Sequence, residues 1–164
     1  MFSRMTFAAV VLATGQTPGP QLNPERAVVL SAGDGTRQIV QCSREVPGPV
    51  TGTWSPDPET IRRFDVLLAP ALQVAINHEQ PDASKRPPVS GYYRQYFGLV
   101  VDGHRIVYVN GFHEVYLKLE GRVPRGQNWR IKAVNACDGW TLFFGAEYDL
   151  VSRQIQHLRF NGQG

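Results

Sequence analysis

Residues 92–113 have the sequence YYRQYFGLVVDGHRIVYVNGFH, in which two apolar, aromatic-rich runs flank the dipeptide Asp102-Gly103. Both residues of an Asp-Gly pair tolerate a positive φ, as the two-residue turns between antiparallel strands require. The stretch therefore predicts a long β-hairpin. Counting outward from the turn pairs Val101 with His104 and so fixes the register along both strands.

A second Asp-Gly pair, Asp138-Gly139, predicts a second hairpin of the same kind. Its register would set Arg130 opposite Glu147 as a cross-strand ion pair. A final strand at 155–160 would then complete a five-strand antiparallel meander.

The segment after residue 57 predicts one amphipathic helix. Asp57 is placed to cap it, and Pro58 suits the first helical position, where a missing N–H is no loss. Apolar residues follow at three- and four-residue spacing, namely Ile61, Phe64, Leu68, Leu72 and Ala75, widened by Leu67, Ala71 and Ile76. About nineteen residues would give a helix of roughly 28 Å. We expect a kink or a break at Pro70.

One long helix followed by an antiparallel meander predicts an α+β fold, a cystatin-like or nuclear-transport-factor-like roll in which the sheet wraps the helix. Upstream, the β-branched runs 26–31 and 36–42 around a Gly-rich turn predict an N-terminal hairpin. The Pro- and Gly-rich stretch 45–57 predicts a surface loop. With 164 residues, 42% hydrophobic and 19% charged, the chain suits one folded domain and is too apolar for a disordered polyelectrolyte.

The N-terminal residues predict export. A basic Arg4 precedes a short apolar stretch, the pattern of a signal peptide over residues 1–13, with small residues suited to cleavage before Thr14. The alternative is a terminal strand or helix. Residues 14–25 predict a flexible segment, and residues 26–162 a single α+β domain. No apolar run approaches the ~20 residues that a membrane-spanning helix needs.

Cys42 and Cys137, the two cysteines of the chain, predict a disulfide. Their separation of 95 residues suits neither a Cys-x-x-Cys redox pair nor a zinc knuckle. In an oxidising compartment such a bridge restricts the unfolded chain and stabilises the fold by roughly 4 to 5 kcal/mol. Two buried free thiols are the alternative.

The sequence carries no motif of a nucleophilic, phosphate-binding or calcium-binding site, and His113-Glu114 and His78-Glu79 lack the second histidine of a metalloprotease helix. We therefore predict no catalytic residue, no metal and no cofactor. A net charge of +3 with dispersed basic residues argues against nucleic acid as a partner. The alternative is an acid–base unit in which Asp149 or Glu114 pairs with one of the four histidines.

Two surfaces are candidates for binding. Tyr92, Arg94 and Tyr96 alternate along one predicted strand, and aromatic rings beside an arginine can recognise a carboxylate-bearing or protein partner. An ordinary core with one arginine reaching solvent explains the same pattern. The second candidate is the long connection that begins with His113 and Glu114 and runs to residue 128.

The second half of the chain also carries a set of short motifs: YYRQY from Tyr92, YVN from Tyr108 with Phe112, CDG from Cys137, Tyr148-Asp149, and FNG from Phe160. Over about Trp54 to Gly162 they resemble a family of small exported or lipid-anchored proteins of Gram-negative bacteria. The resemblance implies a compartment and a fold, but no activity. Where that family has a second glycine after CDG, this chain has Trp140.

These observations favour a non-enzymatic periplasmic or secreted domain that binds a protein or a cell-envelope component. One alternative is an immunity or inhibitor protein that blocks a cell-wall hydrolase with a protruding loop. Another is a roll that binds or hydrolyses a small ligand in the hollow between helix and sheet. An apolar cavity with a His or Asp inside would favour the small ligand, and a packed core with a convex loop would favour the inhibitor.

Overall fold

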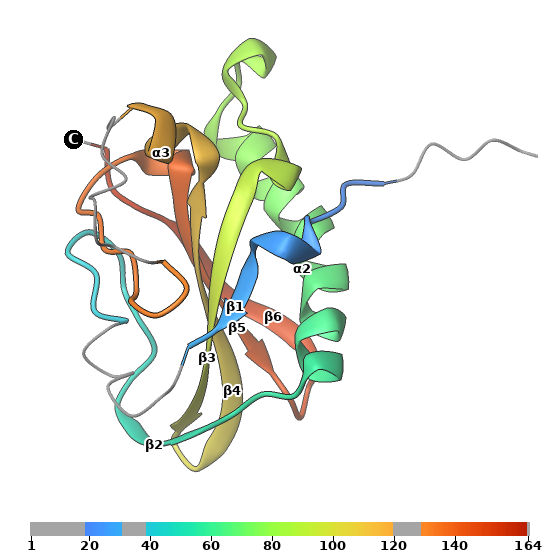
Figure 1. Ribbon diagram of the computed structural model, residues 1–164, viewed down its shortest axis with the longest axis vertical. Helices are drawn as coiled ribbons and strands as arrows, with labels where there is room; N and C mark the ends of the chain where they lie inside the picture. The colour runs from blue at the N-terminus through green and yellow to red at the C-terminus, as the bar shows by residue number, and fades with distance from the viewer. Residues whose placement is uncertain (1–18, 31–38, 120–128, 164) are drawn as a thin grey trace, which may run out of the picture.

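A long helix lies across one face of a twisted sheet in the computed structural model, which describes residues 19–30, 39–119 and 129–163 (Figure 1). The helix, α2 (Pro58–Glu79), packs on a mixed, mostly antiparallel six-stranded sheet, which confirms the predicted α+β class. The strands are β1 (Ala27–Val29), β2 (Val50–Trp54), β3 (Tyr92–Val101), β4 (His104–His113), β5 (Phe143–Asp149) and β6 (Gln154–Phe160). A short helix, α3 (Glu114–Leu119), follows β4, and 3₁₀ turns occur at Pro24–Arg26, Ala83–Lys85, Val89–Gly91 and Trp140–Leu142.

The central hairpin forms as predicted. Asp102 and Gly103 adopt φ values of 49° and 79°, the left-handed pair that a tight hairpin turn needs. The β3–β4 register starts with Val101 opposite His104 and continues without a shift along both strands. The local turn chemistry is therefore sufficient to specify this pair.

The other edge of β3 is shared by two short strands. β1 runs parallel to its first half, with Val29 opposite Tyr96, and β2 runs antiparallel to its second half, with Trp54 opposite Gly98. Gly98 is required there, because a Cβ on it would lie 2.2 Å from the carbonyl oxygen of Trp54.

One prediction about this region is wrong, and another is tested only in part. The first arm of the predicted N-terminal hairpin forms β1, which pairs with β3, and residues 39–42 of the second arm form no strand. The turn and residues 36–38 of the second arm lie outside the described residues. The stretch 45–57, predicted to be a loop, contains β2. The pairing partner of a short strand depends on which sheet edge is available, and local sequence does not carry that information.

The second predicted hairpin is also wrong, because residues 129–139 form no strand and β5 takes the place beside β4. Glu147 consequently lies opposite Tyr108 and Gln156 in the two ladders, not opposite Arg130. An Asp-Gly pair supplies a turn but does not choose a partner strand. The final strand of the predicted meander forms as β6.

Helix α2 begins as predicted, with the Asp57 carboxylate accepting a hydrogen bond from the Thr60 N–H at 2.7 Å. It continues through Pro70 to Glu79, so the expected break at Pro70 does not occur. Pro70 and Val66, whose carbonyl loses its helical partner, both lie on the exposed side, where water can bond to that carbonyl. No helix among the described residues is long and apolar enough to cross a bilayer.

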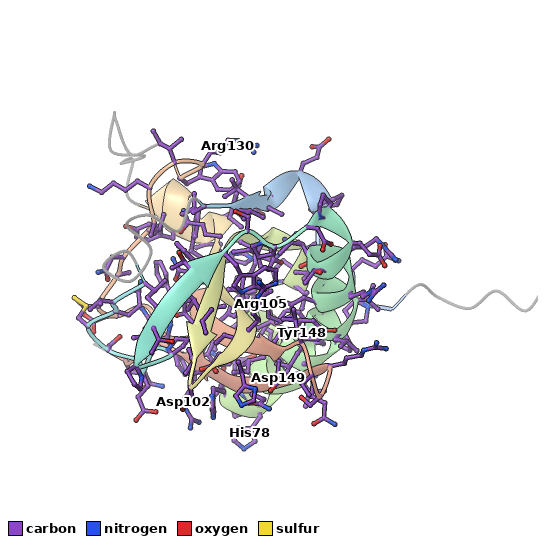
Figure 2. The ribbon with its side chains drawn as sticks, turned by 90° about the horizontal axis from the view of Figure 1, so that it is seen from below. His78, Asp102, Arg105, Arg130, Tyr148 and Asp149 are labelled. Carbon is purple, nitrogen blue, oxygen red and sulfur yellow. A yellow bond between two sulfur atoms is a disulfide. The ribbon has the colours of Figure 1, made fainter. Side chains whose placement is uncertain are left out.

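The opposite face of the sheet is covered by irregular chain. Loop residues Ile39 and Ala133 pack there against Phe97 and Tyr108. The predicted disulfide is confirmed: Cys42 and Cys137 join the two covering segments with an S–S distance of 2.09 Å. In Figure 2 the helix lies on one side of the sheet and the disulfide sulfur, in yellow, on the other. The sheet is thus the middle layer of the molecule.

Candidate functional site

The predicted recognition surface lies in the interior. Tyr92, Arg94 and Tyr96 do share one face of β3, but that face lies under α2, and all three side chains are 0% exposed. Tyr92 and Tyr96 belong to the main core together with Phe64 and Phe144, and Arg94 is buried beside them. A partner therefore cannot reach these rings without displacing the helix.

Arg94 is held by an ion pair that the sequence analysis did not identify. Its Nε lies 3.2 Å from Asp65 Oδ1 and 3.0 Å from the Tyr96 hydroxyl. Its Nη atoms donate to the carbonyl oxygens of Tyr92 at 3.0 Å and Asn23 at 2.8 Å. The signal was available, because Asp65 is a single carboxylate between core positions of the helix and Arg94 a single cation in an aromatic strand.

The Tyr96 hydroxyl also donates to the Asp65 carboxylate. Burial raises the pKa of Tyr96 well above its usual value, since the phenolate form would lose its hydration. Tyr96 is thus a neutral hydrogen-bond donor. A small pocket of about 360 Å³ opens beside Asp65 and Tyr96, with walls from Pro24, Val29 and Ile61. At its floor the Asp65 carboxylate accepts hydrogen bonds from Arg94 and from the Tyr96 hydroxyl.

His113 and Glu114 make different contacts at the end of β4. His113 is 1% exposed; its Nε2 lies 3.2 Å from the Pro88 carbonyl oxygen and its Nδ1 accepts from the Val115 N–H at 3.2 Å. Because a carbonyl can only accept and an amide N–H can only donate, this arrangement requires the neutral Nε2–H tautomer. Glu114 forms an ion pair with Arg26 at 3.0 Å. Both residues therefore tie the end of β4 to its neighbours.

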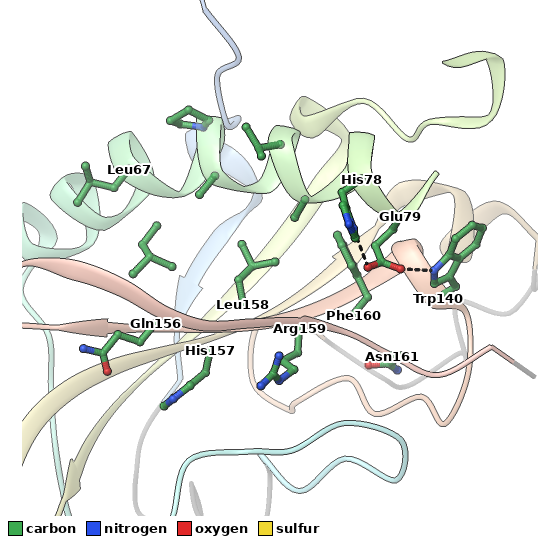
Figure 3. A pocket seen from close by; sticks show the side chains of 15 residues that line it. Leu67, His78, Glu79, Trp140, Gln156, His157, Leu158, Arg159, Phe160 and Asn161 are labelled. Atoms are coloured by element: carbon green, nitrogen blue, oxygen red, sulfur yellow. Dashed lines mark hydrogen bonds and ion pairs between the residues drawn. The ribbon is translucent and has the colours of Figure 1, made fainter. Parts of the chain in front are cut away.

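An open groove of about 940 Å³ lies between α2 and β6 (Figure 3). Its apolar walls come from both elements: Leu67, Pro70, Ala71, Val74 and Ala75 on the helix, and Ile155, Leu158 and Phe160 on the strand. Leu158 and Phe160 point from β6 towards α2, whereas Gln156, His157 and Arg159 point away from the helix. We name this feature the α2–β6 groove.

The helix wall of the groove is apolar where a surface helix is ordinarily polar. Val74 is 69% exposed and Leu67 40% exposed, and Val66, just outside the groove, is 64% exposed. Residues 66–76 carry no charge on any side of the helix. A helix that is apolar all round is typical of one that is covered on all sides. This wall has the composition of an interface.

Polar groups gather at one end of the groove. His78 Nδ1 lies 3.3 Å from Glu79 Oε1, and the Trp140 indole N–H donates to Glu79 Oε2 at 3.4 Å. Across the strand, His157 Nδ1 lies 3.0 Å from Glu147 Oε1. Arg159 is exposed and forms no ion pair with any described carboxylate.

β6 adds an open backbone edge to the groove. It is the last strand of the sheet, and within the described chain it pairs with β5 alone. The ladder shifts between Gly145 and Glu147, where His157 takes a φ of 50°, so β6 carries a bulge at His157. The groove therefore combines apolar side chains with unpaired backbone donors and acceptors.

Comparisons with protein-family models, curated proteins and solved structures find no match for this chain. Within the part of the chain that the structure describes, no group of three or more His, Cys, Asp or Glu side chains could hold a metal ion.

Proposed function

We propose that this protein is a non-enzymatic binding domain, exported to the periplasm or beyond, that holds part of a protein or another cell-envelope component in the α2–β6 groove. The observation that carries the proposal is the charge-free, exposed wall of α2. It replaces the aromatic face of β3 as the binding surface, since that face is buried.

The free energy available from this wall is substantial. Burying a Val or Leu side chain fully is worth about 1.5–3 kcal/mol relative to leaving it exposed. Leu67 and Val74 are both well exposed, and Ile155, Leu158 and Phe160 are half-buried. Contiguous exposed apolar surface of this kind marks interaction sites on globular proteins.

The disulfide supports the exported location. Cys42 and Cys137 are both exposed, so their bond is open to thiol exchange. Cytosolic thiol systems keep such bonds reduced, whereas the bacterial periplasm and the extracellular space allow them to persist. Together with the predicted signal peptide over residues 1–13, this favours an envelope partner.

The structure gives less support to the two alternative functions. Most of the space between α2 and the sheet is filled by aromatic side chains, including Phe64 and Tyr148. The pocket of about 360 Å³ that remains beside Asp65 offers a small ligand little, because the Asp65 carboxylate is already bonded to Arg94 and Tyr96. The inhibitor interpretation depends on the connection 113–128, most of which lies outside the described residues.

Site-specific photo-crosslinking in cells tests the binding role. A photoreactive residue at position 74, in the groove, is compared with one at position 77, where Asn77 is exposed on the same helix and outside the groove. We expect a discrete adduct from position 74 that is absent from position 77, with its partner identified by mass spectrometry. Equal labelling at both positions, or none at either, would overturn the binding role.

Intact mass tests the location. We expect the full chain expressed in a bacterial host to lose residues 1–13 and to show two alkylatable thiols only after reduction. An uncut chain with free thiols would contradict export, whatever the crosslinking shows.

A further inference from the structure

The open edge of β6 lies directly beside the apolar wall of α2. In β-strand addition, an extended peptide pairs its backbone with an exposed sheet edge while its alternate side chains enter neighbouring pockets. The α2–β6 groove offers both parts: a strand edge without a described partner and the apolar side chains of Leu67 and Val74 next to it.

The bulge at His157 limits what can pair there. A bulge disrupts the regular ladder of an edge strand and hinders continuous pairing with another long strand. The regular part of β6 beyond the bulge is short and consists of Leu158, Arg159 and Phe160. A short segment fits this edge better than the full sheet of a second copy of this chain.

Charge decides the side-chain pattern of such a segment. A strand added to β6 continues the pleat of the sheet, so its side chains alternate between the helix face and the opposite face. On the helix face they meet Leu67, Ala71 and Val74. On the opposite face they meet Arg159, which lines a pocket with Glu45, Asp102 and Glu147 but forms an ion pair with none of them.

We propose that the groove binds an extended peptide segment that adds as a short strand to the edge of β6, with apolar side chains against α2 alternating with an acidic side chain on Arg159. The inference rests on the proposed binding function and names the chemistry of the partner. It requires no covalent step and no cofactor.

Peptide selection tests it directly. The full-length oxidised protein is immobilised and challenged with a displayed library of random dodecapeptides, and enriched peptides are resynthesised for fluorescence anisotropy. We expect enriched sequences in which apolar and acidic residues alternate. Two N-methylated forms of an enriched peptide should then differ. Methylation of the N–H groups that face β6 should abolish binding, and methylation of the alternate set should spare it, because only one set of N–H groups faces β6.

Charge reversal at Arg159 provides the matched comparison. Arg159→Glu should weaken binding by about tenfold or more, and Arg159→Lys should retain most of it. Val74→Glu should also abolish binding. Lys132→Glu, which changes the charge equally at an exposed site on the loop over the other face, should leave the affinity unchanged.

Each remaining outcome overturns the inference. Enrichment without alternation, binding that survives Val74→Glu, or an equal loss with Lys132→Glu would show that the peptides bind elsewhere or by charge alone. No enrichment at all would remove the peptide as partner. If position 74 still gave a crosslinked adduct in cells, the binding function would stand and its partner would be of another class, such as a lipid.

Discussion

Between residues 66 and 76, helix α2 carries no charge on either side, but its two sides lie in opposite environments. On the side facing the sheet, Phe64, Leu68 and Leu72 are 0% exposed. On the other side, over the same turns of the helix, Val74 is 69% exposed and Leu67 40% exposed. The sheet-facing side is part of the buried core, while the outward side has the same kind of apolar residues exposed to solvent. Apolar periodicity alone therefore does not distinguish a protein interior from a surface that awaits a partner.

The largest effect should come from the sheet-facing side. Phe64→Ala removes a ring stacked on Tyr148 at a centroid distance of 5.2 Å and leaves a cavity in the core. We expect a loss of about 3–5 kcal/mol in the free energy of unfolding. Urea denaturation followed by circular dichroism measures it. A loss below that of an ordinary surface substitution would show that the two sides of α2 are not as different as the structure implies.

A somewhat smaller effect is expected at the polar contact on the same side. Asp65→Asn keeps the shape of the side chain but leaves the buried Arg94 guanidinium without its carboxylate. We expect a loss of about 2–3 kcal/mol in the free energy of unfolding.

The control removes both charges. Asp65→Leu combined with Arg94→Met should recover part of the loss, because no buried charge remains unpaired. The double variant could instead lose the free energy of unfolding that Asp65→Asn loses plus a further, independent amount for Arg94. In that case the two residues would not act as a pair.

The cap of α2 should give a moderate effect that depends on pH. The hydrogen bond from the Thr60 N–H lowers the pKa of the Asp57 carboxyl below its usual value. A lowered folded-state pKa stabilises the fold above the unfolded-state pKa of about 4, and this stabilisation is lost as the pH falls further. Asp57→Ala should therefore lower Tm by a few degrees at pH 7 and by less at pH 3. Equal Tm losses at both pH values would assign the effect to helix propensity instead.

The smallest effect on stability is expected on the open side of α2. Val74→Glu places a charge at a side chain that is already 69% exposed, so the free energy of unfolding should change by no more than about 0.5 kcal/mol. Binding should nevertheless be lost. A large destabilisation at this position would mean that the wall is covered within the protein's own fold, and the comparison between the two sides would fail.

The sequence was most informative where a local interaction decides the structure. Asp102-Gly103 specifies its hairpin because both residues favour the turn and the strands on either side are long. Asp138-Gly139 carries the same signal, yet its upstream arm forms no strand. There β5 occupies the edge of β4 that the upstream arm would need. This pairing between segments far apart in the sequence overrides the turn. The N-terminal arm is a second example, because β1 finds its partner in β3 more than sixty residues away.

The candidate site was predicted less well than the fold. The alternation of Tyr92, Arg94 and Tyr96 identifies one face of a strand correctly, but a period of two does not indicate which face a helix will cover. Leu67 was assigned to the core stripe of the helix, and it lines the groove instead. An exposed apolar site of this kind has no sequence motif, since its residues are the same ones that build cores.

The disulfide has a mechanical consequence. Any tension applied between the two chain ends passes from Cys42 to Cys137 through the covalent bridge, and the chain between them bears none of it. Helix α2 lies inside this shielded loop, whereas β5 and β6 lie beyond Cys137, in the segment that carries the tension. The two walls of the groove thus belong to different mechanical parts of the molecule. Pulling on the C-terminus would peel β6 and then β5 away from β4, release whatever the groove holds, and separate Tyr148 from Phe64 of α2.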